Sequence, residues 1–321
     1  MKAIIINQAG GPEAMQYTEV PVPPPKPDEV LVKVEAIGVN FIDVYNREGR
    51  YKLPLPFTLG QEMSGTVTEV GSYAKDFKKG DRVAQTSVVG SYAEYQAVPA
   101  QRLVRVPDAI SFEQAAASML QGATMHYLMR STYPVKAGDT IFIHAAAGGM
   151  GLLLTQFGKK LGARVIGTAS TDEKLKLAKH AGAGEVINYS THDFVAEAKR
   201  LTGNKGVDVV YDGVGKTTFD GSLQILRPRG YMVLFGGASG AVPPFDPLRL
   251  TQHGSLFLTR PSLAHYSAPE ELQWRMKEVF DLIQSGELKI HIGQKYKLAD
   301  AAQAHRDLEA RKTTGKILLI P

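Results

Sequence analysis

The sequence of 321 residues contains no cysteine. Disulfides, thiolate zinc sites and cysteine nucleophiles are therefore excluded, and the composition is compatible with a reducing compartment. No stretch approaches the roughly 20 apolar residues that a membrane-spanning helix needs. The apolar run in residues 1–8 is too short for a signal peptide. We therefore expect a soluble, cytoplasmic protein.

Runs of like charge are also missing. The formal net charge is +5, from 37 basic and 32 acidic residues, and no block of five like charges occurs. A solvated surface with a few anion contacts accounts for this balance, so neither a membrane nor a nucleic-acid surface is indicated. The eight histidines form no i,i+4 pair typical of a metal site, and no G-x-S-x-G elbow indicates a serine hydrolase.

The chain changes its hydrophobic period near residue 112. Before that point, residues 30–36 and 65–71 alternate like strands, and residues 21–27 hold five prolines, which favour an extended loop. Several short strands with turn signals predict a barrel-like β domain. Residues 316–321 return to a strand pattern at the end of the chain.

From residue 112 on, helical and strand patterns alternate. Residues 112–129 are helical in pattern, and shorter helical segments follow near 150–161, 172–181, 192–201 and 222–226. Strands are expected at 140–144, 164–168, 185–188, 207–212, 231–235 and 255–259, and a late helix at 269–285. This alternation predicts a doubly wound parallel sheet.

Residues 141–156 (IFIHAAAGGMGLLLTQ) read as a strand, a glycine turn and a helix. Such a turn suits a dinucleotide: Gly148 lets the backbone approach a pyrophosphate, and Gly151 lets the helix pack closely on the strand. The free N–H groups at the start of the helix favour phosphate. Ala146 replaces the first glycine of the usual pattern, so a turn needed only for packing is the alternative.

The end of the next strand bears on the choice of cofactor. An NAD site usually places an acid there, about 20 residues after the turn. Here the strand ends in Ser170 and Thr171, with Lys174 one helical turn further on. Room for a 2′-phosphate favours NADP over NAD, although Lys174 could equally be a solvated helix residue. We predict Asp172 to be the N-cap of the helix that follows.

Several motifs together resemble the zinc-independent quinone oxidoreductases, the NADPH:quinone reductase and zeta-crystallin group of the medium-chain dehydrogenase/reductase superfamily. They are residues 38–43 (GVNFID), 59–62 (LGQE), 80–83 (GDRV), 144–151 (HAAAGGMG) and 259–263 (TRPSL). The resemblance covers essentially the whole chain. It implies a GroES-like β-barrel domain of residues 1–120 and 263–321, a Rossmann domain of residues 121–262, and a cofactor in the cleft between them.

Amides stand where zinc-dependent relatives hold the catalytic metal. Asn40, Gln61 and Gln121 match the three ligand positions, and the cysteine-rich structural-zinc lobe is absent. Because amides bind zinc poorly beside thiolate or imidazole, we expect no metal site. Without a Lewis acid, an already electrophilic acceptor is the favoured substrate: a quinone or an α,β-unsaturated carbonyl.

The resemblance also implies site residues. Tyr51 would hydrogen-bond the substrate carbonyl and Asn40 would place nicotinamide or substrate, although a loop tyrosine and a turn asparagine are the alternatives. Asp43 could orient these side chains. The implied NADP-binding residues are Asn40, Phe41, Asp43, Tyr45, Thr124, Gly148, Gly149, Met150, Gly151, Ser170, Lys174, Tyr189, Phe235, Gly236, Gly237, Ala238 and Arg311. For Arg311, an exposed surface charge is the alternative.

We therefore expect an NADPH-dependent quinone reductase that needs neither metal nor flavin. An NADPH-dependent enone or alkenal double-bond reductase is the second enzyme interpretation. A crystallin-like or RNA-binding protein is the alternative outside enzymes, and the modest net charge argues against it. The resemblance further implies a homodimer, or a tetramer, formed through the edge of the Rossmann sheet within residues 245–262, where a free strand edge needs cover.

Overall fold

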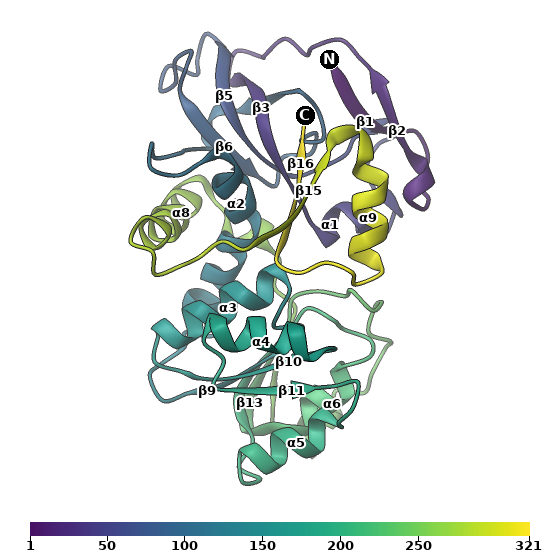
Figure 1. The fold of residues 1–321 in the computed structure, drawn as a ribbon, viewed down its shortest axis with the longest axis vertical. Helices are drawn as coiled ribbons and strands as arrows, with labels where there is room; N and C mark the ends of the chain where they lie inside the picture. The colour runs from purple at the N-terminus through teal and green to yellow at the C-terminus, as the bar shows by residue number, and fades with distance from the viewer. The chain divides into compact units, whose positions relative to one another are not determined.

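The computed structural model describes all 321 residues and divides them into two compact units (Figure 1). Unit 1 contains Met1–Ala123 and Ser267–Pro321, and unit 2 contains Thr124–Tyr266. The sequence division placed these boundaries after residues 120 and 262. None of the helices is both long and apolar enough to span a lipid bilayer.

Unit 2 is built on a six-stranded parallel sheet in the order β11-β10-β9-β12-β13-β14. This order confirms the predicted doubly wound sheet, because consecutive strands run outward from β9 in two directions. The carboxyl ends of β9 and β12 meet where the order reverses, which is the usual ligand crevice of such sheets. The strands are β9 (Thr140–Ile143), β10 (Arg164–Ala169), β11 (Glu185–Asn188), β12 (Val207–Asp212), β13 (Leu226–Leu234) and β14 (Phe257–Thr259).

Helices cover both faces of this sheet. Helices α3 (Gly149–Lys160) and α4 (Asp172–Ala181) lie on one face, and α5 (Phe194–Leu201) and α6 (Phe219–Gln224) lie on the other (Figure 1). Because strand residues alternate between faces, neighbours in β9 divide accordingly: Ile141 contacts α3 at Gly158, and Phe142 joins the core formed with α5 and α6. The remaining helical segments are α7 (Leu248–Gln252), η3 (Leu128–Thr132) and η4 (Leu263–Tyr266).

The largest differences from the predicted boundaries in unit 2 lie around α6 and β13. Strand β13 begins at Leu226, whereas residue 231 was predicted. Helix α6 spans Phe219–Gln224, whereas residues 222–226 were predicted. The first half of β13 contains Pro228 and Gly230, which break the apolar pattern that marks a strand. Arg229 there has φ 59°, and its N–H donates to the carbonyl of Gly254, so the strand is locally irregular.

Unit 1 is β-rich and uses both ends of the chain. Its long strand β3 (Glu29–Val39) pairs with β5, β7 and β16. The C-terminal β16 (Lys316–Ile320) runs antiparallel to β3, with Ile317 opposite Val39. The other strands are β1 (Lys2–Ile6), β2 (Met15–Glu19), β4 (Phe57–Thr58), β5 (Glu62–Val70), β6 (Arg82–Thr86), β7 (Tyr95–Pro99), β8 (Leu103–Arg105) and β15 (Ile292–Lys297).

The helices of unit 1 border this β structure. They are α1 (Phe41–Arg47), α2 (Phe112–Tyr127, whose last turn belongs to unit 2), α8 (Pro269–Gln284) and α9 (Ala301–Glu309), with the short 3-10 turns η1 (Pro12–Ala14), η2 (Ala100–Arg102) and η5 (Leu298–Asp300). The core joins Val32 and Val34 of β3 to Ile317 and Leu319 of β16 and to Ala304 of α9. The N-terminal and C-terminal segments are thus parts of one hydrophobic core.

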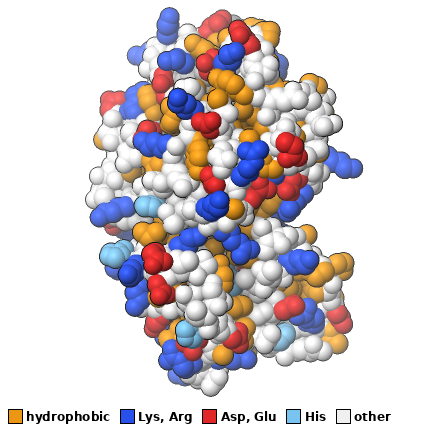
Figure 2. All heavy atoms as spheres, turned by 45° about the vertical axis from the view of Figure 1, so that its right-hand side comes forward, with side chains coloured by type: hydrophobic (Ala, Val, Ile, Leu, Met, Phe, Trp, Pro, Cys, Tyr) orange, Lys and Arg blue, Asp and Glu red, His pale blue; other side chains and the backbone are white.

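The surface carries mixed charge. On the face shown in Figure 2, Lys and Arg side chains lie among Asp and Glu side chains over most of the area. Exposed ion pairs such as Lys2–Glu19 and Arg200–Glu197 belong to this pattern. It is the pattern of a solvated surface.

Candidate functional site

The glycine turn lies at the carboxyl end of β9. Gly148 is the N-cap of α3, and no side chain caps this end of the helix. A Cβ atom on Gly151 would lie 2.3 Å from the carbonyl oxygen of Ala145 and 2.5 Å from the Cα of Ala146, so only glycine allows this approach. The first N–H groups of α3, including those of Gly149 and Met150, have no acceptor within the helix. These features fit the pyrophosphate of a dinucleotide.

The carboxyl ends of β10 and β11 bring three predicted residues to one edge of the sheet. The Ser170 carbonyl accepts a hydrogen bond from Ser190 Oγ at 2.9 Å, and the Tyr189 N–H donates to Ala169 at 3.1 Å. Lys174 lies in the first turn of α4, which begins two residues after Ser170. This edge therefore presents hydroxyls and an ammonium side chain, which suit a phosphate monoester.

The predicted cap of α4 was wrong. Thr171 is the N-cap, and its side-chain oxygen accepts the N–H of Lys174. Asp172 is the first helical residue, and its Oδ1 accepts a hydrogen bond from Asn188 Nδ2 at 3.0 Å. Threonine and aspartate both cap helices well, and the strand ends early enough for the hydroxyl to take this position.

Phe235, Gly236, Gly237 and Ala238 form a loop after β13. The loop packs backbone to backbone on the turn after β12, since the Phe235 N–H donates to the Asp212 carbonyl at 2.9 Å. A Cβ on Gly236 would lie 2.4 Å from the carbonyl oxygen of Gly213. The loop thus borders the crevice where the strand order reverses. Thr124 lies on α2 and is 7% exposed.

His144 directly follows β9 and packs among Thr168 and Ser222. It is buried, and its Nε2 lies 2.9 Å from Ser222 Oγ, which also lies 3.3 Å from a carboxylate oxygen of Asp212. The serine hydroxyl stands between the imidazole and the carboxylate, so this trio lacks the order of a hydrolytic triad. Desolvation lowers the pKa of His144 and keeps the ring neutral at neutral pH.

In unit 1, Asn40 belongs to a closed ring of three side chains. Lys316 Nζ donates to Asn40 Oδ1 at 2.7 Å and to Glu62 Oε2 at 2.5 Å. Asn40 Nδ2 donates to the same Glu62 oxygen at 2.7 Å. All three side chains are at most 5% exposed. The ring places a fixed cation against the amide oxygen of the predicted site residue.

Asp43 ends a second buried chain of hydrogen bonds. Its Oδ2 accepts the Asn40 N–H at 2.9 Å and the Tyr92 hydroxyl at 3.1 Å. The Tyr92 oxygen also lies 3.0 Å from His305 Nε2, and Arg47 Nη1 lies 3.0 Å from His305 Nδ1. Because a guanidinium only donates, Nδ1 accepts and Nε2 carries the proton. Every donor in the chain therefore points toward Asp43.

This environment shifts two pKa values in opposite directions. Burial raises the pKa of Asp43 to about 7, although the Asn40 N–H, Lys316 and Tyr92 favour its charged form. Its Oδ1 is buried without a hydrogen-bond partner. Burial and the charge of Arg47 lower the pKa of His305 to about 3.

The aromatic residues near α1 form a row. Phe41 and Tyr45 have ring centroids 6.3 Å apart, and Tyr45 meets Tyr51 edge-on at 5.9 Å. Tyr51 is 47% exposed, and its hydroxyl makes no hydrogen bond. It is therefore available as a donor to a ligand. Arg311 is exposed in the turn between α9 and β16, with φ 58°.

The residues at the three metal-ligand positions do not fit a zinc ion. Asn40 could ligate a metal only through Oδ1, and that atom accepts a hydrogen bond from the Lys316 ammonium. A dication bound there would meet a buried positive charge at close range. The other two positions, Gln61 and Gln121, are again amides, which are weak zinc ligands.

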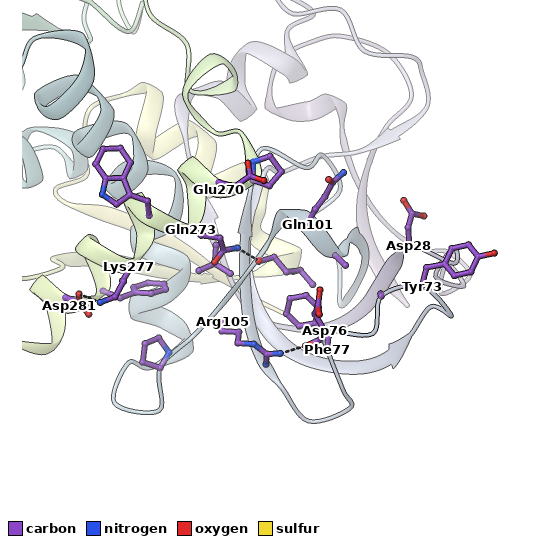
Figure 3. Close-up of a pocket in the computed structure, with 18 residues that line it drawn as sticks. Asp28, Tyr73, Asp76, Phe77, Gln101, Arg105, Glu270, Gln273, Lys277 and Asp281 are labelled. Atoms are coloured by element: carbon purple, nitrogen blue, oxygen red, sulfur yellow. Dashed lines mark hydrogen bonds and ion pairs between the residues drawn. The ribbon is translucent and has the colours of Figure 1, made fainter.

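A hollow of about 880 Å³ lies elsewhere in unit 1, between α8, the loop around residues 73–77 and the segment of residues 100–107 that contains η2 and β8 (Figure 3). None of the predicted site residues lines it. Among its charged side chains, Lys277 pairs with Asp281, and Arg105 pairs with Asp81 outside the hollow. Gln273 donates to the carbonyl of Leu103 at 2.8 Å. The hollow is therefore separate from the candidate site.

Sequence reasoning missed Lys316, Tyr92, His305 and Arg47, and it used Glu62 only as part of a motif. Lys316 lies 276 positions from Asn40, and His305 lies 258 positions from Arg47. No spacing in the sequence signals such contacts. The one available signal was a lone lysine at the start of an otherwise apolar strand, residues 316–320.

Comparisons with known proteins show the family to which this chain belongs. Residues 26–108 match the alcohol dehydrogenase GroES-like domain, and residues 149–284 match the zinc-binding dehydrogenase family. The chain is 48% identical to a quinone oxidoreductase of Pseudomonas aeruginosa, over 100% of this chain and 99% of the relative. It is 41% identical to a 2-haloacrylate reductase of Burkholderia sp., over 99% and 98% of the two chains.

A solved structure has the same fold. The crystal structure of Escherichia coli quinone oxidoreductase complexed with NADPH superposes with a TM-score of 0.98, at 47% identity over 100% of both chains. The strand order of unit 2 and the GroES-like match in unit 1 account for this agreement. The chain belongs to the quinone oxidoreductases of the medium-chain dehydrogenase/reductase superfamily.

Proposed function

We propose that this protein reduces quinones with hydride from NADPH. The observation that carries the proposal is the full-length identity of 48% to a quinone oxidoreductase. An Escherichia coli relative of 47% identity holds NADPH in its crystal structure, which supports the same cofactor here. The serine, lysine and tyrosine at the β10 and β11 edge support NADPH over NADH, since they can receive the 2′-phosphate.

Bound NADPH would supply the hydride, and the chain's own residues would bind and orient the reactants. The glycine turn and the N-terminus of α3 hold the pyrophosphate, and Ser170, Lys174 and Tyr189 hold the adenosine phosphate. Tyr51 donates its hydroxyl to the acceptor oxygen, where negative charge develops during the reaction. Asn40 places the nicotinamide or the acceptor through its fixed amide.

The proposed reaction needs neither metal nor flavin. A quinone is already electrophilic, and the charge left after hydride addition is delocalised over the ring. Proximity and one or two hydrogen-bond donors then suffice. The buried Lys316 cation beside Asn40 supports this proposal, because it disfavours a metal ion at the same place.

A double-bond reductase is the second candidate function. The observation that favours it is the 41% identity to a 2-haloacrylate reductase over 99% of this chain. A haloacrylate is a conjugated acid that accepts hydride at carbon, so the demands on the protein resemble those of a quinone.

A panel of acceptors tests both candidates. NADPH oxidation is followed with quinones, enones, 2-haloacrylates and saturated alcohols, each with and without a metal chelator. We expect turnover of quinones above all other classes and no loss with chelator. Higher kcat/KM for enones or haloacrylates would establish the second function, and inhibition by the chelator would refute the metal-free reaction.

The proposal includes a homodimer through the edge of the parallel sheet. Strand β14 pairs only with β13 and leaves its other edge free. Phe257 on this strand is 50% exposed and stacks on Tyr231 with centroids 4.6 Å apart. Sedimentation equilibrium of the protein and of Phe257→Lys tests this: we expect a dimer that dissociates in the variant. A monomeric parent protein would contradict the assembly.

A further inference from the structure

The ring of Lys316, Asn40 and Glu62 fixes the direction of one side-chain amide. The ammonium donates to the amide oxygen, and the amide nitrogen donates to the carboxylate that also holds the ammonium. Rotating the amide by half a turn would set its NH₂ group against the ammonium and its oxygen against the carboxylate. Two charge-assisted hydrogen bonds would become two repulsive contacts. The Asn40 amide therefore has one orientation.

The strand register prepares this ring. Ile317 of β16 lies opposite Val39, so Lys316 comes level with Asn40. Ile37 of β3 lies opposite Met63, so Glu62 comes level with Gly38. Each member of the ring thus follows or precedes a paired residue by one position, and the sheet brings all three together.

Two further contacts hold the Glu62 carboxylate in place. Its Oε1 accepts the N–H of Leu120 from α2 at 2.5 Å. Its Oε2 would lie only 2.0 Å from a Cβ atom added to Gly38, so the carboxylate fits here because residue 38 is glycine. The anion is therefore anchored independently of Asn40.

The ring leaves Asn40 with limited but well-directed capacity for a ligand. One lone pair of Oδ1 is free, and the second N–H of Nδ2 has only a long contact of 3.4 Å with the Gly38 carbonyl. A buried ion pair is costly to desolvate, and apolar side chains of similar volume often stabilise a core as well or better. Stability alone is therefore a weak reason for this pair, and orientation of Asn40 is a stronger one.

We propose that Lys316 and Glu62 are positioning residues of the reductase, which act by holding the Asn40 amide in its one orientation. This inference rests on the proposed function, in which Asn40 places nicotinamide or acceptor. Without Lys316 the amide loses the partner of its oxygen and keeps only its hydrogen bond to Glu62, so its orientation is held less firmly. The substitution leaves the glycine turn intact, and the cofactor would still bind there, so the loss appears in kcat more than in NADPH affinity.

The test is a double-mutant cycle on kcat. Lys316→Met, Asn40→Ala and the double variant are compared with the parent protein, using the acceptor that the parent reduces fastest in the panel. If the best acceptor is not a quinone, the proposed substrate is wrong, but the comparison of kcat among the variants is still valid. We expect Lys316→Met to lower kcat at least tenfold alone, and less than twofold when Asn40 is already alanine.

Two more variants control for folding. Lys295→Met removes a lysine of the neighbouring strand β15 that pairs with Glu113 at the surface, and we expect parental kcat. The double variant Lys316→Met/Glu62→Gln removes both buried charges and so leaves no unpaired ion in the core. It replaces Lys316→Met in the comparison if that single variant does not fold. We expect this pair also to lower kcat at least tenfold, with NADPH affinity within threefold of the parent.

A structural role would give a different pattern. A loss of kcat that persists in the Asn40→Ala background would overturn the proposal, because the lysine would then act independently of the amide. Parental kcat in Lys316→Met, in the folded charge-free pair or in Asn40→Ala would overturn it as well.

Discussion

We predict that folding of unit 1 moves a proton from His305 to Asp43. In the unfolded chain these groups have their ordinary pKa values of 6.5 and 3.8. In the fold, burial raises the pKa of Asp43 to about 7 and, together with Arg47, lowers that of His305 to about 3. Between pH 4.5 and 6.5 the unfolded chain therefore carries the proton mainly on His305, and the folded chain carries it mainly on Asp43.

The two shifts act on stability with opposite signs. The raised pKa of Asp43 stabilises the fold at low pH, and this contribution is lost as the pH rises from 3.8 to about 7. The lowered pKa of His305 stabilises the fold above pH 6.5, and this contribution is lost as the pH falls toward 3. Each slope approaches about 1.4 kcal/mol per pH unit. In their common window they cancel.

Substituting either residue alone should reveal the pH dependence of the unfolding free energy, which the two opposite shifts cancel in the parent protein. In Asp43→Asn only the histidine term remains, so we expect the free energy of unfolding to fall by about 2 kcal/mol, relative to the parent protein, from pH 6.5 to pH 4.5. In His305→Gln only the aspartate term remains, and the same change of pH should raise it by about 2 kcal/mol. The double variant should run parallel to the parent.

The chain offers a local probe for this measurement. Trp274 is the single tryptophan and lies on α8 in unit 1, as do both titrating groups. Urea unfolding followed by its fluorescence at several pH values gives the free energies. Lys316, Glu62, Tyr92 and Arg47, the other titratable groups that face this pair, stay in every variant. Single variants that run parallel to the parent would refute the proton transfer.

Three further predictions concern single side chains. Gly151→Ala should raise the Kd for NADPH at least tenfold, because the new Cβ would lie 2.3 Å from the Ala145 carbonyl oxygen. Gly184→Ala is the control, because its Cβ would make only an ordinary contact at 3.7 Å. Calorimetric titration with NADPH measures the Kd of both variants. Lys174→Ala should reduce the ratio of NADPH to NADH affinity about tenfold, as for one lost charge-assisted bond. Tyr92→Phe should cost about 1–3 kcal/mol of unfolding free energy, and more than Tyr296→Phe, whose partners lie nearer the solvent.

The parts of the molecule that the sequence predicted are local in the chain. The strand, turn and helix at residues 140–160 lie within about twenty positions, so glycine spacing and apolar period determine them together. The alternation of strands and helices likewise predicted the doubly wound parallel sheet, whereas the order of its strands comes from the structure. Where local signals competed, prediction failed, as when Thr171 and not Asp172 capped α4.

The buried polar networks could not be predicted in this way. Glu62 and Lys316 are 254 positions apart, and Tyr92 and His305 are 213 apart. Taken singly, each is an ordinary charged or aromatic residue, and Tyr92 lies in the loop between β6 and β7. Their relation appears only once β16 pairs with β3 and α9 packs beside β1, because those contacts set the register.

Both networks converge on the start of α1, and both depend on the last segment of the chain. Lys316 on β16 orients the side chain of Asn40, and His305 on α9 supports Asp43, whose carboxyl group accepts the backbone N–H of the same asparagine. The glycine turn between β9 and α3, from which the sequence predicts the cofactor, contains none of these residues. Substitutions of Lys316 and His305 should therefore act mainly on turnover, while changes at the turn should act mainly on cofactor affinity.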